Sequence, residues 1–168
     1  MTHDIHNRSS KGQQSKAQVH EHKSDALVSV VIPLFNHEKY IIETLDSIFA
    51  QDHSNIEIIL VDDVSTDNGL QLAKDKLASC EVAYTVLENT YNVGVCKTIN
   101  RGIRAAQGKY TCLIASDDML AMGRIKRHVK ILEECIDPDI VACHGPLQVI
   151  SKDGKLLGLK GNRAKNKH

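Results

Sequence analysis

Aromatic residues are scarce in this chain, and the scarcity excludes several classes of binding protein. Its 168 residues include no tryptophan, and aromatic residues make up 4% of the total. The 21 Lys and Arg residues are balanced by 21 Asp and Glu residues, which gives a formal net charge of zero. Nucleic-acid-binding domains normally carry a basic surface or aromatic stacking platforms. We therefore expect no nucleic-acid partner.

Long apolar runs are also missing. No segment approaches the roughly 20 apolar residues that cross a bilayer, and the first residues, MTHDIHNRSSKGQQ, contain no apolar core of a signal peptide. We expect no transmembrane segment and a cytoplasmic location, with peripheral membrane association left open. The five cysteines form no CxxC pair, so we expect reduced thiols that are mostly buried as small hydrophobic residues.

Three common signatures of phosphate and metal chemistry are absent. The chain has no GxxxxGK[ST], no GxGxxG after its first apolar run and no HExxH. These absences argue against a P-loop, a classical dinucleotide site and a zinc protease.

Four short apolar runs, each followed by a polar cluster, dominate what is present. The runs are rich in β-branched residues, as expected of strands buried on both faces, and they are VSVVIPLFN (28–36), IEIILVDDVSTD (56–67), YTVLENTYNVG (84–94) and YTCLIASDD (110–118). Helical spacing predicts helices over 38–50, 94–106 and 124–134. A further helix is predicted to begin at a cap formed by Ser65 or Asp67. A fifth strand is predicted at 140–143, and a hairpin over 147–150 and 155–159.

This alternation predicts an α/β fold, a three-layer α/β/α arrangement around a mostly parallel sheet. Three parts are expected along the chain. Residues 1–26 form a polar disordered tail, residues 27–150 form the domain, and residues 151–168 form the rest of the hairpin and a basic tail.

Two acidic pairs follow predicted strands, Asp62 with Asp63 and Asp117 with Asp118. Because an open α/β sheet binds its ligands at the carboxyl ends of parallel strands, these acids are expected to meet there. Carboxylates suit Mg²⁺ or Mn²⁺ bridging to phosphates. The alternative for each pair is a solvated turn that opens the next helix, capped by Ser65, Thr66 or Asp67 in the first case.

The third strand is followed by the turn Asn92–Gly94, which precedes a predicted helix. A helix N-terminus is a natural anion seat, and Lys97 and Arg101 either add positive charge there or remain solvated. The histidines at positions 37, 53, 128 and 144 are interpreted as structural or solvated, with a site role left open for His144.

Taken in order, VSVVIPLFN, ILVDDVSTD, NVGVCKTINRGIRAAQGKY and LIASDDML resemble the nucleotide-binding half of family 2 glycosyltransferases, which have the Rossmann-like GT-A fold. The resemblance covers about Val28 to Val149. It implies a nucleotide-diphosphate sugar as donor, most simply a UDP-sugar, with Mn²⁺ or Mg²⁺ as cofactor. It also implies a saccharide or lipid-linked acceptor and a role in polysaccharide biosynthesis.

The resemblance also implies residue roles. Pro33 and Phe35 would lie along the base of the nucleotide, with Asn36 and Glu38 nearby. Asp63 would accept a hydrogen bond from the base, with Asp62 beside it. The segment from Asn92 through Gly94 to Lys97 would border the nucleotide, Asp117 would lie near the ribose, and Asp118 would hold the metal.

Two departures from the family pattern stand out. Ala115 occupies a position where many relatives carry another acid. The general base of the family lies in a later half, and we expect this chain to be a truncated form, so the catalytic base is unknown. Rival hypotheses are a nucleotide-sugar-binding module without turnover and a receiver-like phospho-acceptor domain. A receiver would place acids where Phe35-Asn36 stands and a lysine near His144-Gly145.

Overall fold

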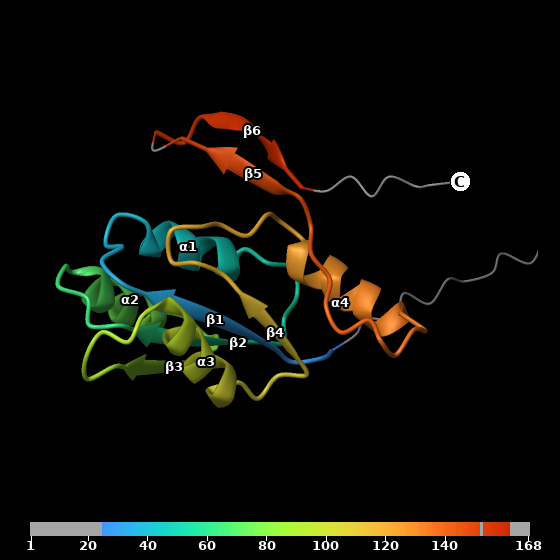
Figure 1. Ribbon diagram of the computed structural model, residues 1–168, viewed down its shortest axis with the longest axis horizontal. Coiled ribbons are helices and arrows are strands. Elements are labelled where there is room, and N and C mark those ends of the chain that lie inside the picture. Colours follow the sequence, from blue (N-terminus) through green and yellow to red (C-terminus); the bar gives the residue numbers. More distant parts are fainter. Residues whose placement is uncertain (1–24, 152, 162–168) are drawn as a thin grey trace, which may run out of the picture.

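A computed structural model describes residues 25–151 and 153–161 (Figure 1). The predicted disordered tail lies outside these residues except for Asp25 and Ala26, and most of the predicted basic tail lies outside them too. The elements alternate along the chain as β1 (Val28–Leu34), α1 (Ile41–Phe49), β2 (Ile56–Asp62), α2 (Gly69–Ala78), β3 (Ala83–Glu88), α3 (Val95–Ala105), β4 (Tyr110–Leu113), α4 (Arg124–Glu134), β5 (Leu147–Ile150) and β6 (Leu156–Lys160).

Four strands form a fully parallel sheet in the order β3-β2-β1-β4. The longest pairing joins β1 and β2, from Val28 opposite Ile56 to Leu34 opposite Asp62. All four strands therefore end at the same edge of the sheet. The predicted α/β class and mostly parallel sheet are confirmed.

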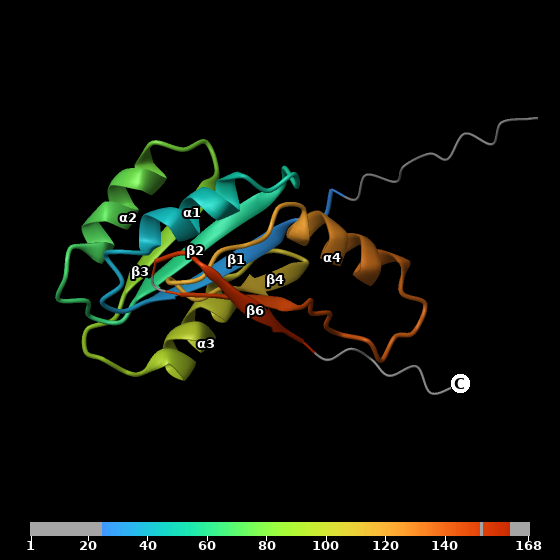
Figure 2. The same cartoon turned by 90° about the horizontal axis from the view of Figure 1, so that it is seen from above.

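Both faces of the sheet are covered, and the apolar runs of β1 and β2 are almost completely buried. Alternate residues of these strands point to opposite faces. Val30, Ile32 and Ile58 belong to the larger core cluster that includes residues of α1, α2 and α4, whereas Val31 and Ile59 belong to a smaller cluster. Figure 2 shows α3 on the opposite side of the sheet from α1 and α2, which gives the predicted three layers.

Helix α3 lies very close to the sheet because a glycine faces it. Gly102 is buried, and a Cβ atom added there would lie 2.4 Å from Cγ1 of Val31 and 3.2 Å from Cγ2 of Val61. Any larger side chain would push α3 outward. Gly102 therefore also sets the position of the N-terminal turn of α3 relative to the carboxyl ends of the strands.

The predicted fifth strand at 140–143 is wrong. Residues 140–146 have no regular secondary structure, and Val141 is 87% exposed. A short apolar segment does not form a strand unless a neighbouring strand supplies hydrogen bonds, and β4 leaves this one unpaired. The predicted strand at 110–115 is also shorter than expected and ends at Leu113.

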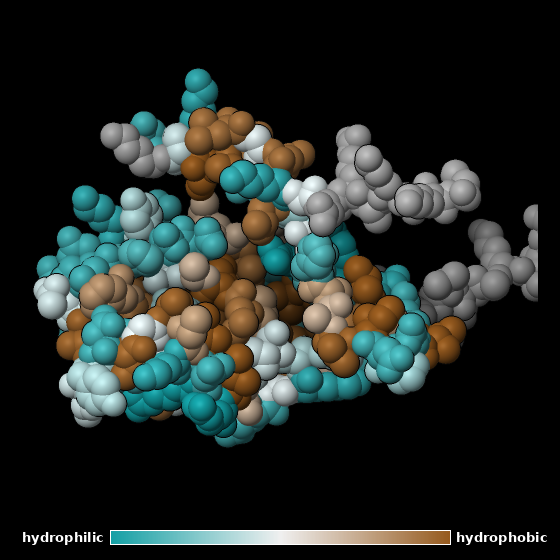
Figure 3. Space-filling view, in the orientation of Figure 1, coloured by the Kyte–Doolittle hydropathy of each residue, from teal (hydrophilic) through white to brown (hydrophobic). Residues whose placement is uncertain are grey.

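The predicted hairpin is confirmed as β5 and β6, which pair antiparallel around a turn closed by the Ser151 N–H donating to the Lys155 carbonyl at 2.8 Å. It forms a two-stranded sheet of its own, apart from the main sheet (Figure 1). Its surface is largely hydrophobic in Figure 3, because it exposes Leu147, Ile150, Leu156, Leu157 and Leu159.

The cysteines are more accessible than predicted. All five are free thiols, but Cys96 is exposed and the other four are half-buried. They lie on β4, near helix ends and in irregular segments rather than in the centre of the sheet. Among the described residues, no helix is long and apolar enough to cross a membrane.

Candidate functional site

The carboxyl ends of β1, β2 and β4 and the loop between β3 and α3 surround one cavity. Its volume is about 280 Å³, and its walls are mostly apolar. Residues from all four strand-end segments line it: Pro33, Leu34, Phe35, His37, Asp63, Asn92, Gly94, Val95, Thr98 and Ser116. Segments far apart in sequence therefore meet at the expected edge of the sheet.

Asp63 is the anionic group of this cavity, and hydrogen bonds fix its carboxylate. Oδ1 accepts from Asn89 Nδ2 at 2.7 Å and from the Val93 N–H at 2.9 Å, while Oδ2 accepts from the Gly94 N–H at 2.9 Å. Burial opposes ionisation, but these bonds outweigh it and hold the pKa of Asp63 below its ordinary value of 3.8. Asp63 is therefore ionised at neutral pH and holds the β3–α3 loop in place.

Asp62 turns away from the cavity and shapes the chain after β2. Its Oδ2 accepts from the Val64 N–H at 3.0 Å and from the Ser65 N–H at 3.1 Å. Val64, held by these bonds, has a φ of +66°, which is unfavourable for a β-branched residue. Asp62 is 3% exposed and its Oδ1 has no hydrogen-bond partner among the described residues.

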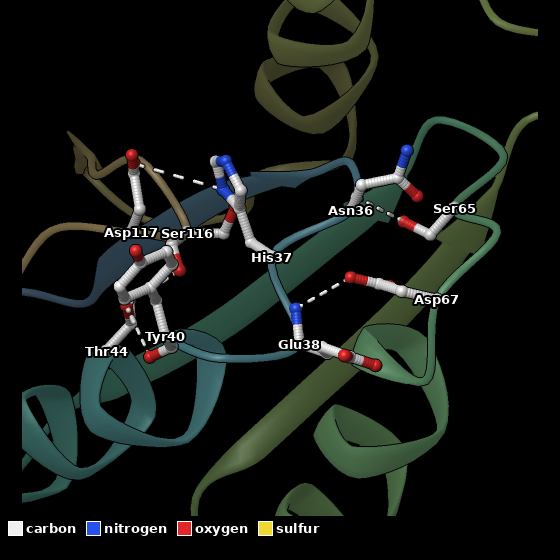
Figure 4. Close-up of polar contacts among 9 residues, drawn as sticks. All are labelled: Asn36, His37, Glu38, Tyr40, Thr44, Ser65, Asp67, Ser116 and Asp117. Atoms are coloured by element: carbon white, nitrogen blue, oxygen red, sulfur yellow. Dashed lines mark hydrogen bonds and ion pairs between the residues drawn. The ribbon is translucent and has the colours of Figure 1, made fainter.

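The loop after β1 is tied to the loop after β2 by two predicted site residues (Figure 4). Asn36 Oδ1 accepts from the Thr66 N–H at 2.7 Å. Glu38 Oε2 accepts from the Asn68 N–H at 3.0 Å, and the Glu38 N–H donates to Asp67 Oδ2 at 2.8 Å. Asn36 and Glu38 therefore do not line the cavity, and their side chains join two loops beside it.

His37 connects the loop after β1 to the loop after β4. Its Nδ1 lies 2.8 Å from Ser116 Oγ and 3.9 Å from Asp117 Oδ1 (Figure 4). Sequence reasoning treated His37 as structural or solvated. The available signal was its position, directly after the predicted cluster Phe35-Asn36.

Asp117 and Asp118 lie in an exposed turn after β4. The Asp118 N–H donates to the Ala115 carbonyl at 3.1 Å, which keeps the turn tight. Burial and the neighbouring Asp117 charge raise the pKa of Asp118, although Arg124 acts in the opposite direction. A carboxylate whose charge is poorly compensated gains from a cation.

The residues present fit a hard divalent cation that takes few protein ligands. No group of three or more His, Cys, Asp or Glu side chains suited to a metal occurs among residues 25–151 and 153–161. Mg²⁺ commonly uses only one or two carboxylates together with substrate phosphates. Asp118, with Asp117 beside it, supplies that kind of incomplete ligand set.

The structure separates the predicted site residues into two groups. Pro33, Phe35, Asp63, Asn92 and Gly94 line the cavity. The residues that do not line it are Asn36, Glu38, Asp62, Lys97, Asp117 and Asp118.

Two further candidates lie away from the cavity. Arg101 is held by the protein itself, because its Nη1 donates to the Glu88 carbonyl at 2.8 Å. His144 is exposed, and it contributes least to the lowered pKa of His128, after burial, Arg124 and Arg127.

A second cavity, of about 490 Å³, lies at the outer edge of β4. It is lined by β4, α4 and residues 141–143, and none of the predicted site residues contributes to it. The smaller cavity therefore carries the candidate chemistry, because the ionised Asp63 and the strand ends converge there.

Comparison with known proteins gives a consistent result. The family model described as glycosyl transferase family 2 matches residues 29–159. Glycosyltransferase GlyG of Streptococcus pneumoniae is 36% identical over 115 residues, which are 68% of this chain and 38% of GlyG. An uncharacterised glycosyltransferase of Rickettsia felis is 32% identical over 133 residues, 79% of this chain and 21% of that protein. The chain thus spans a minor part of these relatives.

Solved structures resemble the chain over about two thirds of its length. The mannosyltransferase PcManGT of Pyrobaculum calidifontis, in complex with GDP-Man and Mn²⁺, is 28% identical with a TM-score of 0.61, and the match covers 67% of this chain and 33% of that one. TarS residues 1–349 of S. aureus, in complex with UDP-GlcNAc, is 31% identical with a TM-score of 0.60, and the match covers 64% and 31%.

Proposed function

Because the chain belongs to glycosyl transferase family 2, we propose that it binds a nucleotide-diphosphate sugar as the donor part of a metal-dependent, inverting glycosyltransferase. The observation that carries this proposal is the ionised Asp63 in a mostly apolar cavity at the strand ends. An apolar cavity with few fixed polar groups suits a flat heterocyclic base.

Asp63 retains the capacity to bind a base. An ionised carboxylate offers about four lone-pair positions, and three are used by Asn89, Val93 and Gly94. The nearby Thr98 hydroxyl also lowers the pKa of Asp63, but it donates its proton to the Gly94 carbonyl at 3.0 Å. We assign the remaining one to an N–H of the base, uracil in the simplest case. Pro33 and the 45% exposed Phe35 supply apolar surface beside it. The complexes of PcManGT with GDP-Man and of TarS with UDP-GlcNAc support a nucleotide sugar as the ligand class.

The diphosphate is assigned to the region between the start of α3 and the turn after β4. Lys97 is exposed in the first turn of α3, where backbone N–H groups and a positive side chain both favour an anion. Asp117 is assigned to the ribose and Asp118 to the metal. A bound Mn²⁺ or Mg²⁺ would stabilise the negative charge of the departing diphosphate.

The acceptor is proposed to be a saccharide or lipid-linked saccharide, and the process polysaccharide biosynthesis. The five free thiols support a reducing compartment such as the cytoplasm. Inverting transfer needs a general base to deprotonate the acceptor hydroxyl, and we assign that role to no residue of this chain.

A second candidate function, nucleotide-sugar binding without turnover, is favoured by the composition of the cavity. Its titratable side chains are those of His37 and Asp63, and the hydrogen bonds that lower the pKa of Asp63 make its carboxylate a weak base. The two candidates share the binding step and differ only in transfer.

Calorimetry with UDP and GDP, each with and without Mn²⁺, tests the shared step. Binding of at least one of them, strengthened by Mn²⁺, is expected, whereas no binding under any condition would contradict the proposal. A UDP-release assay with UDP-sugars and mixed saccharide acceptors then separates the candidates. Metal-dependent release that requires an acceptor supports transfer, and binding without release supports the binding module.

A further inference from the structure

His37 makes a long-range contact that the proposed function leaves unassigned. It lies in the loop after β1, next to Phe35 and Asn36, and its Nδ1 is 2.8 Å from Oγ of Ser116, a residue 79 positions later. Ser116 is 1% exposed and follows β4. The contact therefore joins the first and last strand-end segments of the cavity.

The surroundings hold both partners in place. The Tyr40 ring meets the His37 ring edge to face, with ring centroids 6.1 Å apart. On the other side, Thr44 Oγ1 donates to the Ser116 carbonyl at 3.0 Å. Figure 4 shows Ser116 between His37 and Thr44, so that helix α1 and the loop before it both bind Ser116.

Ser116 is followed immediately by the acids assigned to the ribose and the metal. A shift of Ser116 would move Asp117 and Asp118 relative to Asp63, which is fixed independently by the β3–α3 loop. The separation between the base-binding acid and the metal-binding acid thus depends on how firmly Ser116 is held.

We infer that His37 is a positioning residue that fixes the Ser116–Asp118 turn and thereby supports the metal-dependent part of nucleotide binding. The positioning itself is independent of the ligand, and only its effect on binding rests on the proposed function. His37 acts through Ser116, and we give it no contact with the reacting atoms.

Two isosteric variants separate this role from direct ligand contact. An asparagine amide lies near the position of the histidine Nδ1, whereas a glutamine amide reaches the position of Nε2. If His37 acts through Ser116, His37→Asn retains the wild-type behaviour and His37→Gln resembles His37→Ala. If His37 instead contacts the ligand through Nε2, glutamine rescues and asparagine does not, which would overturn the inference.

Amide hydrogen exchange tests the positioning without any ligand. The reporter is the Asp118 N–H, bonded to the Ala115 carbonyl, and the internal control is the Asp63 N–H, bonded to the Leu34 carbonyl. In His37→Ala and His37→Gln, Asp118 exchange should accelerate about threefold to tenfold, the range that one hydrogen bond supplies. It should stay at the wild-type rate in His37→Asn and in the surface control His144→Ala. Unchanged Asp118 exchange in His37→Ala would overturn the inference, whether or not the protein binds nucleotide.

UDP titrations with Mn²⁺ and with EDTA complete the test. The Mn²⁺-dependent gain in affinity should fall about threefold to tenfold in His37→Ala, and Ser116→Ala should add little to that loss in the double variant. Affinity in EDTA should change less than twofold. An equal loss in both conditions would overturn the inference, whereas absence of UDP binding by the wild-type protein would contradict the proposed function and leave the exchange result to decide the role of His37.

Discussion

The two acidic pairs of the site lie at the same edge of the sheet, one at the end of β2 and the other in the loop after β4, yet their surroundings are opposite. Asp62 and Asp63 are each 3% exposed and accept hydrogen bonds from four backbone N–H groups, those of Val64, Ser65, Val93 and Gly94. Asp117 and Asp118 lie in an exposed turn, where burial and the adjacent charge raise the pKa of Asp118.

This difference separates two uses of the same residue type. The pair after β2 is part of the folded structure, because its charge organises two loops before any ligand arrives. The pair after β4 carries charge that the described part of the protein compensates poorly, as expected of a group whose partner is a cation. The same substitution, Asp to Asn, should therefore affect the two pairs in opposite ways.

The largest effect is expected for Asp63→Asn. Asparagine replaces one acceptor oxygen with an NH₂ donor that faces a backbone N–H of Val93 or Gly94. The free energy of unfolding should fall by about 1.5–3 kcal/mol, the value of hydrogen bonds to a charged group. Urea denaturation at pH 7 measures it. Asp75→Asn is the matched control, since Asp75 is exposed and, within the described part of the chain, accepts a side-chain hydrogen bond from Gln71 alone. Equal stability of the two variants would contradict the prediction.

The stability difference between the wild-type protein and Asp63→Asn should also depend on pH. Because the pKa of Asp63 is lowered by folding, its ionised form stabilises the native state above the ordinary value of 3.8. That contribution is lost as pH falls through the lower pKa of the folded protein. The stability difference between wild type and Asp63→Asn should therefore shrink below pH 3.8. A difference that stays constant down to acid unfolding would show that the charge is not responsible.

The second effect concerns the metal. Asp118→Asn should reduce Mn²⁺-dependent UDP affinity by at least about 10- to 100-fold. Metal affinity usually falls by that factor even when the mutated residue only hydrogen-bonds to a metal ligand. Affinity measured in EDTA should be nearly unchanged. Calorimetry with the exposed control Asp139→Asn checks the prediction, and equal losses with and without Mn²⁺ would remove Asp118 from the metal site.

A third, smaller effect is expected from the backbone strain at Val64, next to the buried pair Asp62 and Asp63. Val64 has a φ of +66°, and this conformation costs a residue with a side chain about 1–2 kcal/mol. Val64→Gly should therefore raise the free energy of unfolding by about 1 kcal/mol, because the half-exposed valine gives up little buried surface. Urea denaturation is again the measurement, and a loss of stability would show that Val64 packing outweighs the strain.

The smallest expected effect is a gain in stability for Asp118→Asn, opposite in sign to the loss expected for Asp63→Asn. Folding raises the pKa of Asp118, so its contribution to stability is present below pH 3.8 and is lost as pH rises through the higher pKa of the folded protein. At pH 7 without metal, Asp118→Asn should therefore stabilise the protein by a few tenths of a kcal/mol at most, given screening by solvent. Thermal unfolding in EDTA measures this gain, which should disappear when the pH is lowered to about 3. Destabilisation at pH 7 would contradict it.

Sequence patterns predicted the parts of this structure that depend on local signals. The bounds of α4, residues 124–134, were predicted from its apolar spacing. The buried runs of β1 and β2 were equally clear. Residues 140–143 looked like a strand by composition, but a strand also requires a partner, and sequence does not show that β4 leaves this segment unpaired.

In the candidate site too, the features that depend on local sequence were predictable and those that depend on distant residues were not. The acids at the strand ends were predictable, because they directly follow apolar runs. The hydrogen bonds that commit Asp63 to the β3–α3 loop were not, since they join it to residues up to 31 positions away. His37 was missed for the same reason, because its partner Ser116 is 79 positions later.

The strand order also has a consequence for synthesis on the ribosome. Strand β1 lies between β2 and β4, and β4 is the last strand of the main sheet to be made. As the chain emerges, β1, β2 and β3 can pair while one edge of β1 still lacks its neighbour. The loop organised by Asp63 can therefore form early, whereas the turn with Asp117 and Asp118 must wait for β4 to close a long stretch of chain, which is slow for parallel strands. A nascent chain thus passes through a stage in which the base-binding half of the site is built and the metal-binding half is not.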